Sequence, residues 1–333
     1  MTTAAASSAP CVVAAVVIGR NEGERLRLCL QSLLHRIEAV VYVDSGSTDG
    51  SADLAAAMGA TVVRLDMQLP FTAARARNEG FSRLAGVAPE AQYVQFVDGD
   101  CELLPTWLGE AAAFLDAHAD VAAACGRRRE RYPDRSVYNR LCDIEWNTPV
   151  GETRAFGGDV LMRAAALRQV GGYRTELIAG EEPELGVRLR AKGWRIWRLD
   201  AEMTWHDAAI TSFSQWWRRM VRTGYAFAQG SHLHGGLPER FWVREARSAW
   251  AWGLALPLAV IFAGGVWGSW ALAGLVAYPL QVLRLYLRER GTSNVPALRA
   301  LFLVLGKFPE GLGALKFLAQ RWTGASPKLI EYK

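Results

Sequence analysis

Charge is missing from one long part of this 333-residue sequence: the 36 residues from Ser248 to Leu283 contain no Asp, Glu, Lys or Arg. Paired cysteines are missing too, because the five cysteines form no CxxC pair and no metal-ligand spacing. They lie mostly in apolar runs, which predicts buried, reduced thiols in a cytosolic compartment and excludes a disulfide scaffold. Hydrophobic residues make up 51% and charged residues 21%, which excludes a disordered or collagen-like chain.

The N-terminus lacks the basic residues that begin a signal peptide. Residues 1–10 are rich in Ala and Ser and predict a disordered tail. From Arg284 onwards there are nine Lys and Arg against three Asp and Glu, whereas residues 1–283 hold 29 basic and 30 acidic residues. The positive charge is therefore local to the C-terminus, which argues against a nucleic-acid partner for the body of the chain.

The uncharged stretch predicts contact with a bilayer. A bilayer core needs about 20 helical residues per crossing, so 36 residues are too many for one span and slightly few for two. We expect a hairpin over about 249–286, either two short membrane helices or a re-entrant pair, turning at Gly264-Gly265. Arginines flank both ends, which places both flanks on the cytoplasmic side. The alternative is a buried helix pair in the core of a soluble protein.

A second apolar pattern follows the hairpin. Over about 309–322, Leu312, Leu315, Leu318 and Trp322 fall on one helical face, which predicts an amphipathic helix at the membrane interface. We therefore divide the chain into a catalytic domain over 11–235 and a membrane-associated helical region over 236–333.

The body of the chain alternates apolar runs with helical patterns. Runs at 11–18, 39–43, 60–65 and 93–97 read as buried strands, and amphipathic stretches separate them. This order predicts an α/β fold with a mostly parallel, Rossmann-like sheet covered on both faces. Ligands of such sheets bind beyond the carboxyl ends of the strands, so the polar residues there are candidates for chemistry.

Carboxylates follow two of these strands. Asp44 comes after the second, where it can contact a base or ribose, and the neighbouring Ser47 and Thr48 suit either a ligand or the cap of the next helix. Asp98-Gly99-Asp100 comes after the fourth, and two hard carboxylates on such a turn suit Mg²⁺ or Mn²⁺. The first turn lacks GxGxxG, which excludes the dinucleotide-binding fingerprint.

Two further candidates lie near the end of the body. His206 follows a predicted strand at 198–204 and suits a metal site, a diphosphate contact or a structural role. On a predicted helix over 211–230, four polar residues share about a third of the circumference: Gln215, Arg218, Arg219 and Arg222. This face suits a diphosphate or a lipid phosphate, or it is a solvated face beside the membrane.

Six segments occur in one order along residues 12–230. They are Arg20-Asn21-Glu22, VDSGSTDGS (43–51), ARARNEG (74–80), FVDGD (96–100), FGGDVLMRAAALRQVGGY (156–173) and GEEPELGVRLRAKGW (180–194). Together they resemble the family 2 glycosyltransferases of the GT-A fold, in a membrane-associated bacterial type. The order of the six carries the resemblance more than any single motif does.

The resemblance implies roles for individual residues. The nucleotide-sugar side would comprise Asn21, Glu22, Asp44, Arg75, Arg77, Asn78 and Asp98. The metal site would comprise Asp100, the more direct ligand, with Asp98 and His206. The acceptor or diphosphate side would comprise Gly157, Gly158, Gln215, Trp216, Arg218 and Arg219. Glu181 and Glu182 replace the family's Glu-Asp pair, so either of them would be the general base.

The resemblance therefore implies an inverting hexosyltransferase that depends on Mg²⁺ or Mn²⁺. Its donor would be a nucleotide diphosphate-sugar, and its acceptor a hydroxyl held at the membrane, as on a lipid-linked acceptor of polysaccharide biosynthesis. The catalytic domain would face the cytoplasm at a bacterial-type inner membrane. The QxxRW box of processive polymerases is only half matched at 215–219, which argues against processive synthesis. The alternatives are a phosphatase of the haloacid dehalogenase type with Asp98 as nucleophile, and a non-catalytic membrane scaffold that retains the fold.

Overall fold

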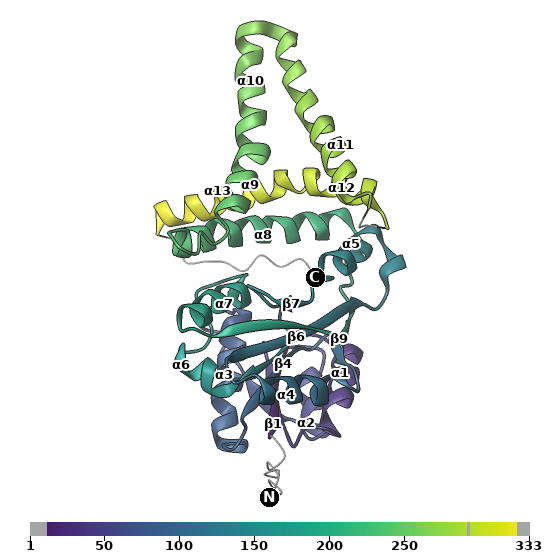
Figure 1. Cartoon of the computed structure of the whole chain (residues 1–333), viewed down its shortest axis with the longest axis vertical. Coiled ribbons are helices and arrows are strands. Elements are labelled where there is room, and N and C mark those ends of the chain that lie inside the picture. The colour runs from purple at the N-terminus through teal and green to yellow at the C-terminus, as the bar shows by residue number, and fades with distance from the viewer. Residues whose placement is uncertain (1–11, 292–293, 325–333) are drawn as a thin grey trace, which may run out of the picture. The chain divides into compact units, whose positions relative to one another are not determined.

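A computed structural model describes residues 12–291 and 294–324 (Figure 1). The tail expected at 1–10 lies outside the described residues. The chain forms two compact units. The first comprises the residues up to Tyr132 together with Glu145–Thr175 and Glu181–Ala208, and the second comprises Pro133–Ile144, Glu176–Gly180 and the residues from Ala209 onwards.

The first unit begins with four parallel strands in the order β3-β2-β1-β4. These are β1 (Val13–Gly19), β2 (Ala39–Asp44), β3 (Thr61–Arg64) and β4 (Tyr93–Asp98). Helices α1 (Glu24–Leu34), α2 (Ser51–Ala57) and α3 (Ala73–Val87) connect them. Most residues of β1, β2 and β4 are buried, as are Leu26, Leu30 and Leu33 of α1, because crossover helices cover such a sheet on both faces.

The rest of the sheet is mixed. Its strands are β5 (Cys101–Leu103), β6 (Val121–Glu130), β7 (Gly151–Glu152), β8 (Val160–Arg163) and β9 (Arg195–His206). β8 pairs antiparallel with β4 and β6, and β9 pairs antiparallel with β5 and β7 but parallel with β6. The predicted α/β class is confirmed, but only about half of the sheet has the predicted parallel strands. The reason is that apolar runs in a sequence predict strands without predicting their directions. Helices α4 (Trp107–Ala117), α6 (Ala164–Gln169) and α7 (Glu181–Ala191) complete this unit.

The second unit is helical. It contains most of α5 (Val137–Glu145), with α8 (Phe213–His234), α9 (Val243–Trp250), α10 (Leu256–Trp267), α11 (Ala277–Glu289), α12 (Pro296–Leu305) and α13 (Lys307–Thr323). Small residues bring α8 and α13 together: the Cα atoms of Gly224 and Gly313 each face the backbone of the other helix. The leucines predicted to form the apolar face of α13 are not in this contact, and Leu312 and Leu315 are exposed.

A helical hairpin stands away from α8 and α13 (Figure 1). A π-helical turn, Ala251–Ala255, joins α9 to α10, and a 3₁₀ helix, Gly268–Val276, joins α10 to α11. The predicted turn at Gly264-Gly265 is wrong, because both residues lie within α10. The chain reverses at Gly268 instead, and glycine adopts its φ of +63° without steric strain. The whole stretch Val243–Glu289 is long and apolar enough to cross a membrane, and only 17% of its most apolar window is buried.

Candidate active site

The carboxyl ends of the parallel strands bring two predicted carboxylates to one edge of the sheet. Asp44 at the end of β2 pairs in register with Gly19, and Asp98 at the end of β4 pairs with Ile18, so both flank the end of β1. The amide of Gly99 donates to the Ile18 carbonyl at 2.8 Å, which turns the chain directly after Asp98. Asp98-Gly99-Asp100 therefore projects beyond the sheet edge, as the α/β pattern predicted.

Asp44 organises the loop that follows it. Its Oδ2 accepts hydrogen bonds from the amides of Gly46 and Ser47, and its Oδ1 accepts one from the Tyr42 hydroxyl. Asn21 ties this loop to the end of β1, because its side chain accepts from the Thr48 amide at 2.8 Å and its own amide donates to Ser47 Oγ. Ser47 and Thr48 thus join two loops, and neither caps α2, whose N-cap is Gly50.

Arg77 on α3 joins three carboxylates. Its Nη2 lies 2.8 Å from Asp98 Oδ1 and 3.0 Å from Glu182 Oε1, and its Nη1 lies 2.8 Å from Glu181 Oε1. The arginine side chain is only 3% exposed, and both glutamates belong to the first turn of α7. Segments about a hundred residues apart in sequence therefore meet at one guanidinium.

Burial and a neighbouring carboxylate set Glu182 apart from an ordinary carboxylate. Burial, together with the neighbouring Glu181, raises the pKa of Glu182 to about 7, although Arg77 opposes this shift. A carboxylate with a pKa near neutrality is suited to accept a proton from a hydroxyl group. Glu182 is also the more exposed of the pair, at 14% of its side chain against 4% for Glu181.

A second arginine, Arg128 on β6, holds the other side of Asp98. Its Nη2 lies 3.2 Å from Asp98 Oδ2 and 2.8 Å from the fully buried Asp159. Asp159 also accepts hydrogen bonds from the Asp98 amide and from Thr204 Oγ1. Burial would raise the pKa of Asp98, but Arg77 and Arg128 hold it below its ordinary value.

Asp100 pairs with His206 at the end of β9. Asp100 Oδ2 lies 3.2 Å from His206 Nε2, and the ring of Trp146 contacts the imidazole at a centroid distance of 4.6 Å. The Nδ1 atom of this largely buried imidazole has no hydrogen-bond partner among the residues that the structure describes. One oxygen donor on the turn before β5 and one nitrogen donor at the end of β9 fit a divalent ion such as Mn²⁺ whose remaining ligands come from a phosphate group.

Cys101 also lies near these groups. A ligand atom of Cys101 lies within 4.8 Å of those of Asp100 and His206, and a second such group joins Cys101 to Asp98 and Asp159. The second group fits a cation less well, because arginines already neutralise both of its carboxylates. Burial raises the pKa of the Cys101 thiol well above its ordinary value, which keeps it protonated.

Two adjacent glycines differ in what surrounds them. A Cβ atom on Gly158 would come within 2.6 Å of Arg77 Nη2 and still closer to the Asp98 carboxylate. A Cβ atom on Gly157 would meet nothing within 4 Å. Gly158 therefore lets the loop after β7 pass directly over the pair formed by Arg77 and Asp98.

Comparisons with known proteins agree with this geometry. Residues 14–161 match the family model described as glycosyl transferase family 2. Over this segment, which is less than half of the chain, the sequence is similar to that family. The phosphatase alternative is thereby set aside, and its proposed nucleophile, Asp98, has both carboxylate oxygens paired with arginines.

Two solved structures share the fold of this chain. The mannosyltransferase PcManGT from Pyrobaculum calidifontis, solved with GDP-Man and Mn²⁺, is 20% identical with a TM-score of 0.57, over 92% of this chain and 86% of that one. Glucosyl-3-phosphoglycerate synthase from Mycobacterium tuberculosis, solved with Mn²⁺ and UDP-Glc, is 16% identical with a TM-score of 0.50, over 68% and 80%. At these identities the likeness establishes the GT-A fold.

A curated relative matches part of the chain. A TPR repeat-containing protein of Synechococcus elongatus is 28% identical over 137 residues, which is 41% of this chain. The chain spans about a third of that relative's length, at 32%. The shared segment is shorter than the first unit of the structure.

Several predicted site residues are occupied elsewhere in the structure. Arg75 donates to the carbonyls of Asp66, Leu69 and Pro70 and so supports the loop before α3. Asn78 exchanges two hydrogen bonds with the backbone of Tyr173. Glu22 pairs with Arg25 at 2.7 Å and packs beside the position of a Cβ on Gly99. Of the predicted nucleotide-side residues, Arg77 and Asp98 have the closest link to the glutamate pair.

The candidates on α8 belong to the second unit. Gln215 forms a capping box with Ser212 at the start of the helix, which accounts for its side chain. Trp216 is buried against Tyr138 and Phe302. Arg218 is exposed and Arg219 half-buried. These contacts give Gln215 and Trp216 structural roles within that unit.

Sequence reasoning missed four residues of the cluster. Asp159 lies inside the segment FGGDV, but its burial under Asp98 depends on the antiparallel entry of β8. Arg128 belongs to a run of three arginines, of which periodicity does not indicate the inward one. Thr204 and Trp146 carry no signal in the sequence, because their neighbours come from distant strands.

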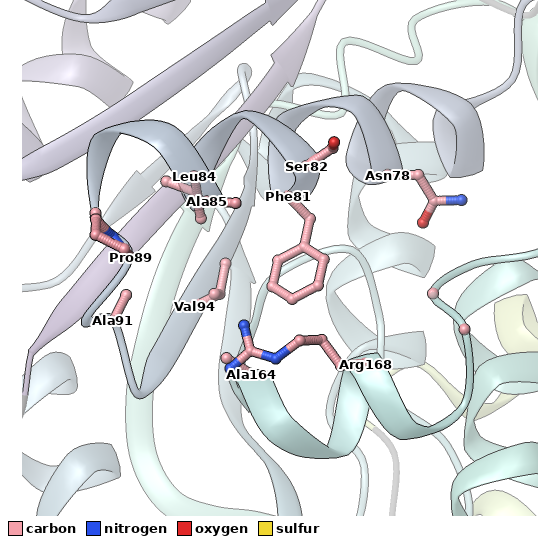
Figure 2. Close-up of a pocket in the computed structure, with 13 residues that line it drawn as sticks. Asn78, Phe81, Ser82, Leu84, Ala85, Pro89, Ala91, Val94, Ala164 and Arg168 are labelled. Atoms are coloured by element: carbon pink, nitrogen blue, oxygen red, sulfur yellow. The ribbon is translucent and has the colours of Figure 1, made fainter.

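A separate cavity of about 540 Å³ lies beside the C-terminal part of α3 (Figure 2). Its lining is mostly apolar and includes Phe81, Leu84, Val94 and Ala164, while the Arg168 guanidinium lies 5.9 Å from the centroid of the Phe81 ring. None of the clustered carboxylates lines this cavity. It is therefore distinct from the candidate active site.

Proposed function

We propose that this domain transfers a hexosyl group from a nucleotide diphosphate-sugar to a hydroxyl group of a membrane-held, lipid-linked acceptor, with inversion at the anomeric carbon. The observation that carries the proposal is the contact of Arg77 with Asp98 on one side and Glu182 on the other. It sets a carboxylate with a raised pKa beside the turn that would hold the donor. The solved structures of similar fold with GDP-Man or UDP-Glc support the choice of donor class.

The proposed reaction is a single displacement. The acceptor hydroxyl loses its proton to the Glu182 carboxylate as its oxygen forms a bond to the anomeric carbon. The bond from that carbon to the phosphate oxygen breaks, and the nucleoside diphosphate leaves with the electron pair. Attack on the face opposite the leaving group inverts the configuration. The neighbouring Glu181, which contacts the same arginine, raises the pKa of Glu182 and so favours its neutral form once the proton has arrived.

Asp100 and His206 would hold a divalent cation, Mg²⁺ or Mn²⁺. Such an ion, when bound, stabilises the negative charge that grows on the leaving diphosphate. The buried Nδ1 without a partner and the adjacent carboxylate support this assignment. Asp44 would face the base or ribose of the donor, since its loop lies at the same sheet edge.

The membrane part of the proposal rests on the second unit. Its hairpin exposes large apolar side chains, and arginines flank the uncharged stretch on both sides. A glycosyl transferase domain in the same chain as such a hairpin suits an acceptor that resides in the bilayer. The catalytic domain would then lie on the cytoplasmic side of a bacterial-type inner membrane.

Calorimetric titration with GDP-mannose, UDP-glucose and other nucleotide sugars, with Mn²⁺ or with EDTA, tests the proposal. We expect one class of nucleotide to bind with Mn²⁺ and to bind much more weakly with EDTA. With the binding donor and a membrane extract as acceptor, NMR of the product should show the inverted anomeric configuration. Binding of no nucleotide sugar would favour a scaffold, and a retained configuration would exclude the single displacement.

A further inference from the structure

The helical hairpin has a covered foot and an uncovered upper part. At the foot, Ala249 and Gly253 pack against α13, because a Cβ on Gly253 would meet the Lys307 backbone. Trp252 and Tyr278 join the two arms there: the Tyr278 hydroxyl donates to the Trp252 carbonyl at 2.7 Å. Tyr278 also contacts Phe308 of α13 at a ring distance of 5.2 Å. The foot is thus fixed to the second unit by contacts from both arms.

Above the foot, the hairpin has almost no cover from the described chain. Its large apolar side chains are exposed, with Trp270 at 84%, Phe262 at 77% and Ile261 at 72%. The others are Leu258, Val266, Trp267, Leu272, Leu275 and Val276. They occur on all sides of the arms, which is typical of a segment surrounded by lipid and unlike a surface patch for one protein partner.

Exposed arginines lie just below the foot on both arms. Arg247 precedes Trp252 by five residues, and Arg284 follows Tyr278 by six, which is about 8–9 Å along each helix. Arg244, Arg288 and Arg290 continue the basic band further down. The headgroup layer on each side of a bilayer is about 5–7 Å thick, so the band matches its depth when the aromatic pair lies at the hydrocarbon boundary.

The length of the upper part then decides between spanning and re-entry. From Trp252 to Trp267 there are fifteen helical steps, which rise about 22 Å. The hydrocarbon core is about 30 Å thick. A hairpin fixed at this foot therefore passes the midplane but ends inside the core, and the convergence of its arms in Figure 1 shortens its depth further.

The backbone of the hairpin is consistent with an end in hydrocarbon. Gly268 reverses the chain, and the 3₁₀ helix Gly268–Val276 begins the return arm at once, without an irregular loop. Unpaired backbone groups are costly in lipid, and this arrangement keeps most of them within helical hydrogen bonds.

We propose that the hairpin is a monotopic anchor, which enters and leaves the same leaflet, ends within the hydrocarbon core, and holds its arginine band against anionic headgroups. The proposal extends the membrane association proposed above and fixes its topology. It places the sugar-transferring unit and both ends of the hairpin on one side, with no segment of residues 243–289 exposed on the other.

A spin label at the tip tests this topology. Cys29, Cys101, Cys125 and Cys142 are buried, so the full chain with Cys11→Ser and Ser269→Cys carries one accessible thiol. The labelled protein is bound to vesicles of phosphatidylethanolamine with phosphatidylglycerol, and accessibility to O₂ and to a water-soluble nickel chelate is measured by EPR power saturation. Ala273→Cys is a second tip site, and Arg247→Cys is the matched foot site.

For a monotopic anchor, both tip labels are highly accessible to O₂ and poorly accessible to the nickel chelate. Their accessibility to the chelate stays low when the chelate is enclosed in the vesicle lumen. The foot label, in contrast, is accessible to chelate added outside. Accessibility of the tip labels to luminal chelate means that the hairpin spans the bilayer and overturns the proposal. Accessibility of the tip labels to external chelate means that it does not insert, which also overturns it. Neither readout involves sugar transfer, and donor binding measured on the same samples shows separately whether the proposed function holds.

Discussion

The carboxylate of Glu182 lies 3.0 Å from Nη2 of Arg77. The same nitrogen lies 2.8 Å from Asp98, at the end of β4. A single guanidinium group therefore links the first turn of α7 to the turn that follows the sheet edge. A change on the donor side of this arginine alters the electrostatic surroundings of the carboxylate on its other side.

Glu182→Gln tests the role of this carboxylate as general base. Glutamine keeps the size and hydrogen-bonding capacity but accepts no proton, so kcat should fall by about 10²–10⁴, the usual contribution of general-base catalysis. Donor affinity, measured by calorimetry, should barely change, because Glu182 contacts Arg77 and not the proposed metal ligands.

Glu181→Gln is the matched control, since it alters the neighbouring buried glutamate on the same arginine. A large loss of kcat in Glu181→Gln with near-normal Glu182→Gln would move the base back by one residue. Near-normal turnover in both variants would remove the carboxylate-base mechanism.

The pH dependence follows from the raised pKa of Glu182. The base acts in its ionised form, so kcat should rise with pH and level off above about 7. Stability should show the opposite trend. Because burial raises the pKa in the folded chain above its ordinary 4.5, the free energy of unfolding falls as pH rises from about 4.5 through about 7. Glu182→Gln should lose this fall and melt at a higher temperature than the wild type at pH 8. Identical pH profiles of Tm in the two proteins would contradict the buried, titrating carboxylate.

Asp100→Ala tests the metal site. Asp100 faces His206 on a turn beyond the sheet, so its removal should abolish the Mn²⁺-dependent part of donor binding while the far-UV circular dichroism stays that of the wild type. Asp53→Ala is the control, because this exposed carboxylate pairs with Arg64 at the surface, where an ion pair contributes little. Equal donor binding by wild type and Asp100→Ala, with EDTA present or absent, would be incompatible with a metal at this position.

Gly158→Ala should lower the rate of sugar transfer, whereas Gly157→Ala should not. The new methyl group at 158 overlaps the Arg77–Asp98 pair, so the loop or the arginine must shift. At position 157 the methyl group meets open space. We expect kcat/KM to fall at least about fivefold for Gly158→Ala and to stay within about twofold for Gly157→Ala, since one such overlap costs about 1–3 kcal/mol. Equal activities would show that the loop position is unimportant.

The sequence predicted the parts of this site that lie at strand ends. Asp44, Asp98 and Asp100 follow apolar strands, and a parallel sheet brings such ends together whatever the details of packing. The family resemblance also indicated Glu181 and Glu182, which the structure places at the start of α7.

The contacts that the sequence did not predict depend on the directions of strands, on the phase of a helix and on backbone conformation. Arg128 and Asp159 meet because β8 runs antiparallel between β4 and β6, and an apolar run of three residues has no signature of direction. Arg75 and Asn78 lie in the same motif as Arg77, but only the helical phase of α3 decides that Arg77 alone points to the carboxylates. The turn of the hairpin was misplaced for a similar reason, since four glycines lie between 264 and 274 and conformation, not composition, selects Gly268.

The contact between α8 and α13 makes the last prediction, which concerns stability. A Cβ on Gly313 would come within 2.6 Å of the Tyr225 amide nitrogen and still closer to the Val221 carbonyl, and neither backbone atom can move without its helix. Gly313→Ala should therefore destabilise the second unit by about 1–3 kcal/mol, the usual cost of overpacking. Its Tm in detergent should fall by about 2–4 °C per kcal/mol.

Gly264→Ala is the matched control within the same unit. It lies inside α10, and its Cβ would meet nothing within 4 Å. Alanine favours a helix over glycine by about 1 kcal/mol, so this variant should melt no lower than the wild type. A Tm loss that is equal in the two variants would mean that any added methyl group perturbs the helical unit. An unchanged Tm in Gly313→Ala would mean that α8 and α13 do not approach as closely as their glycines permit.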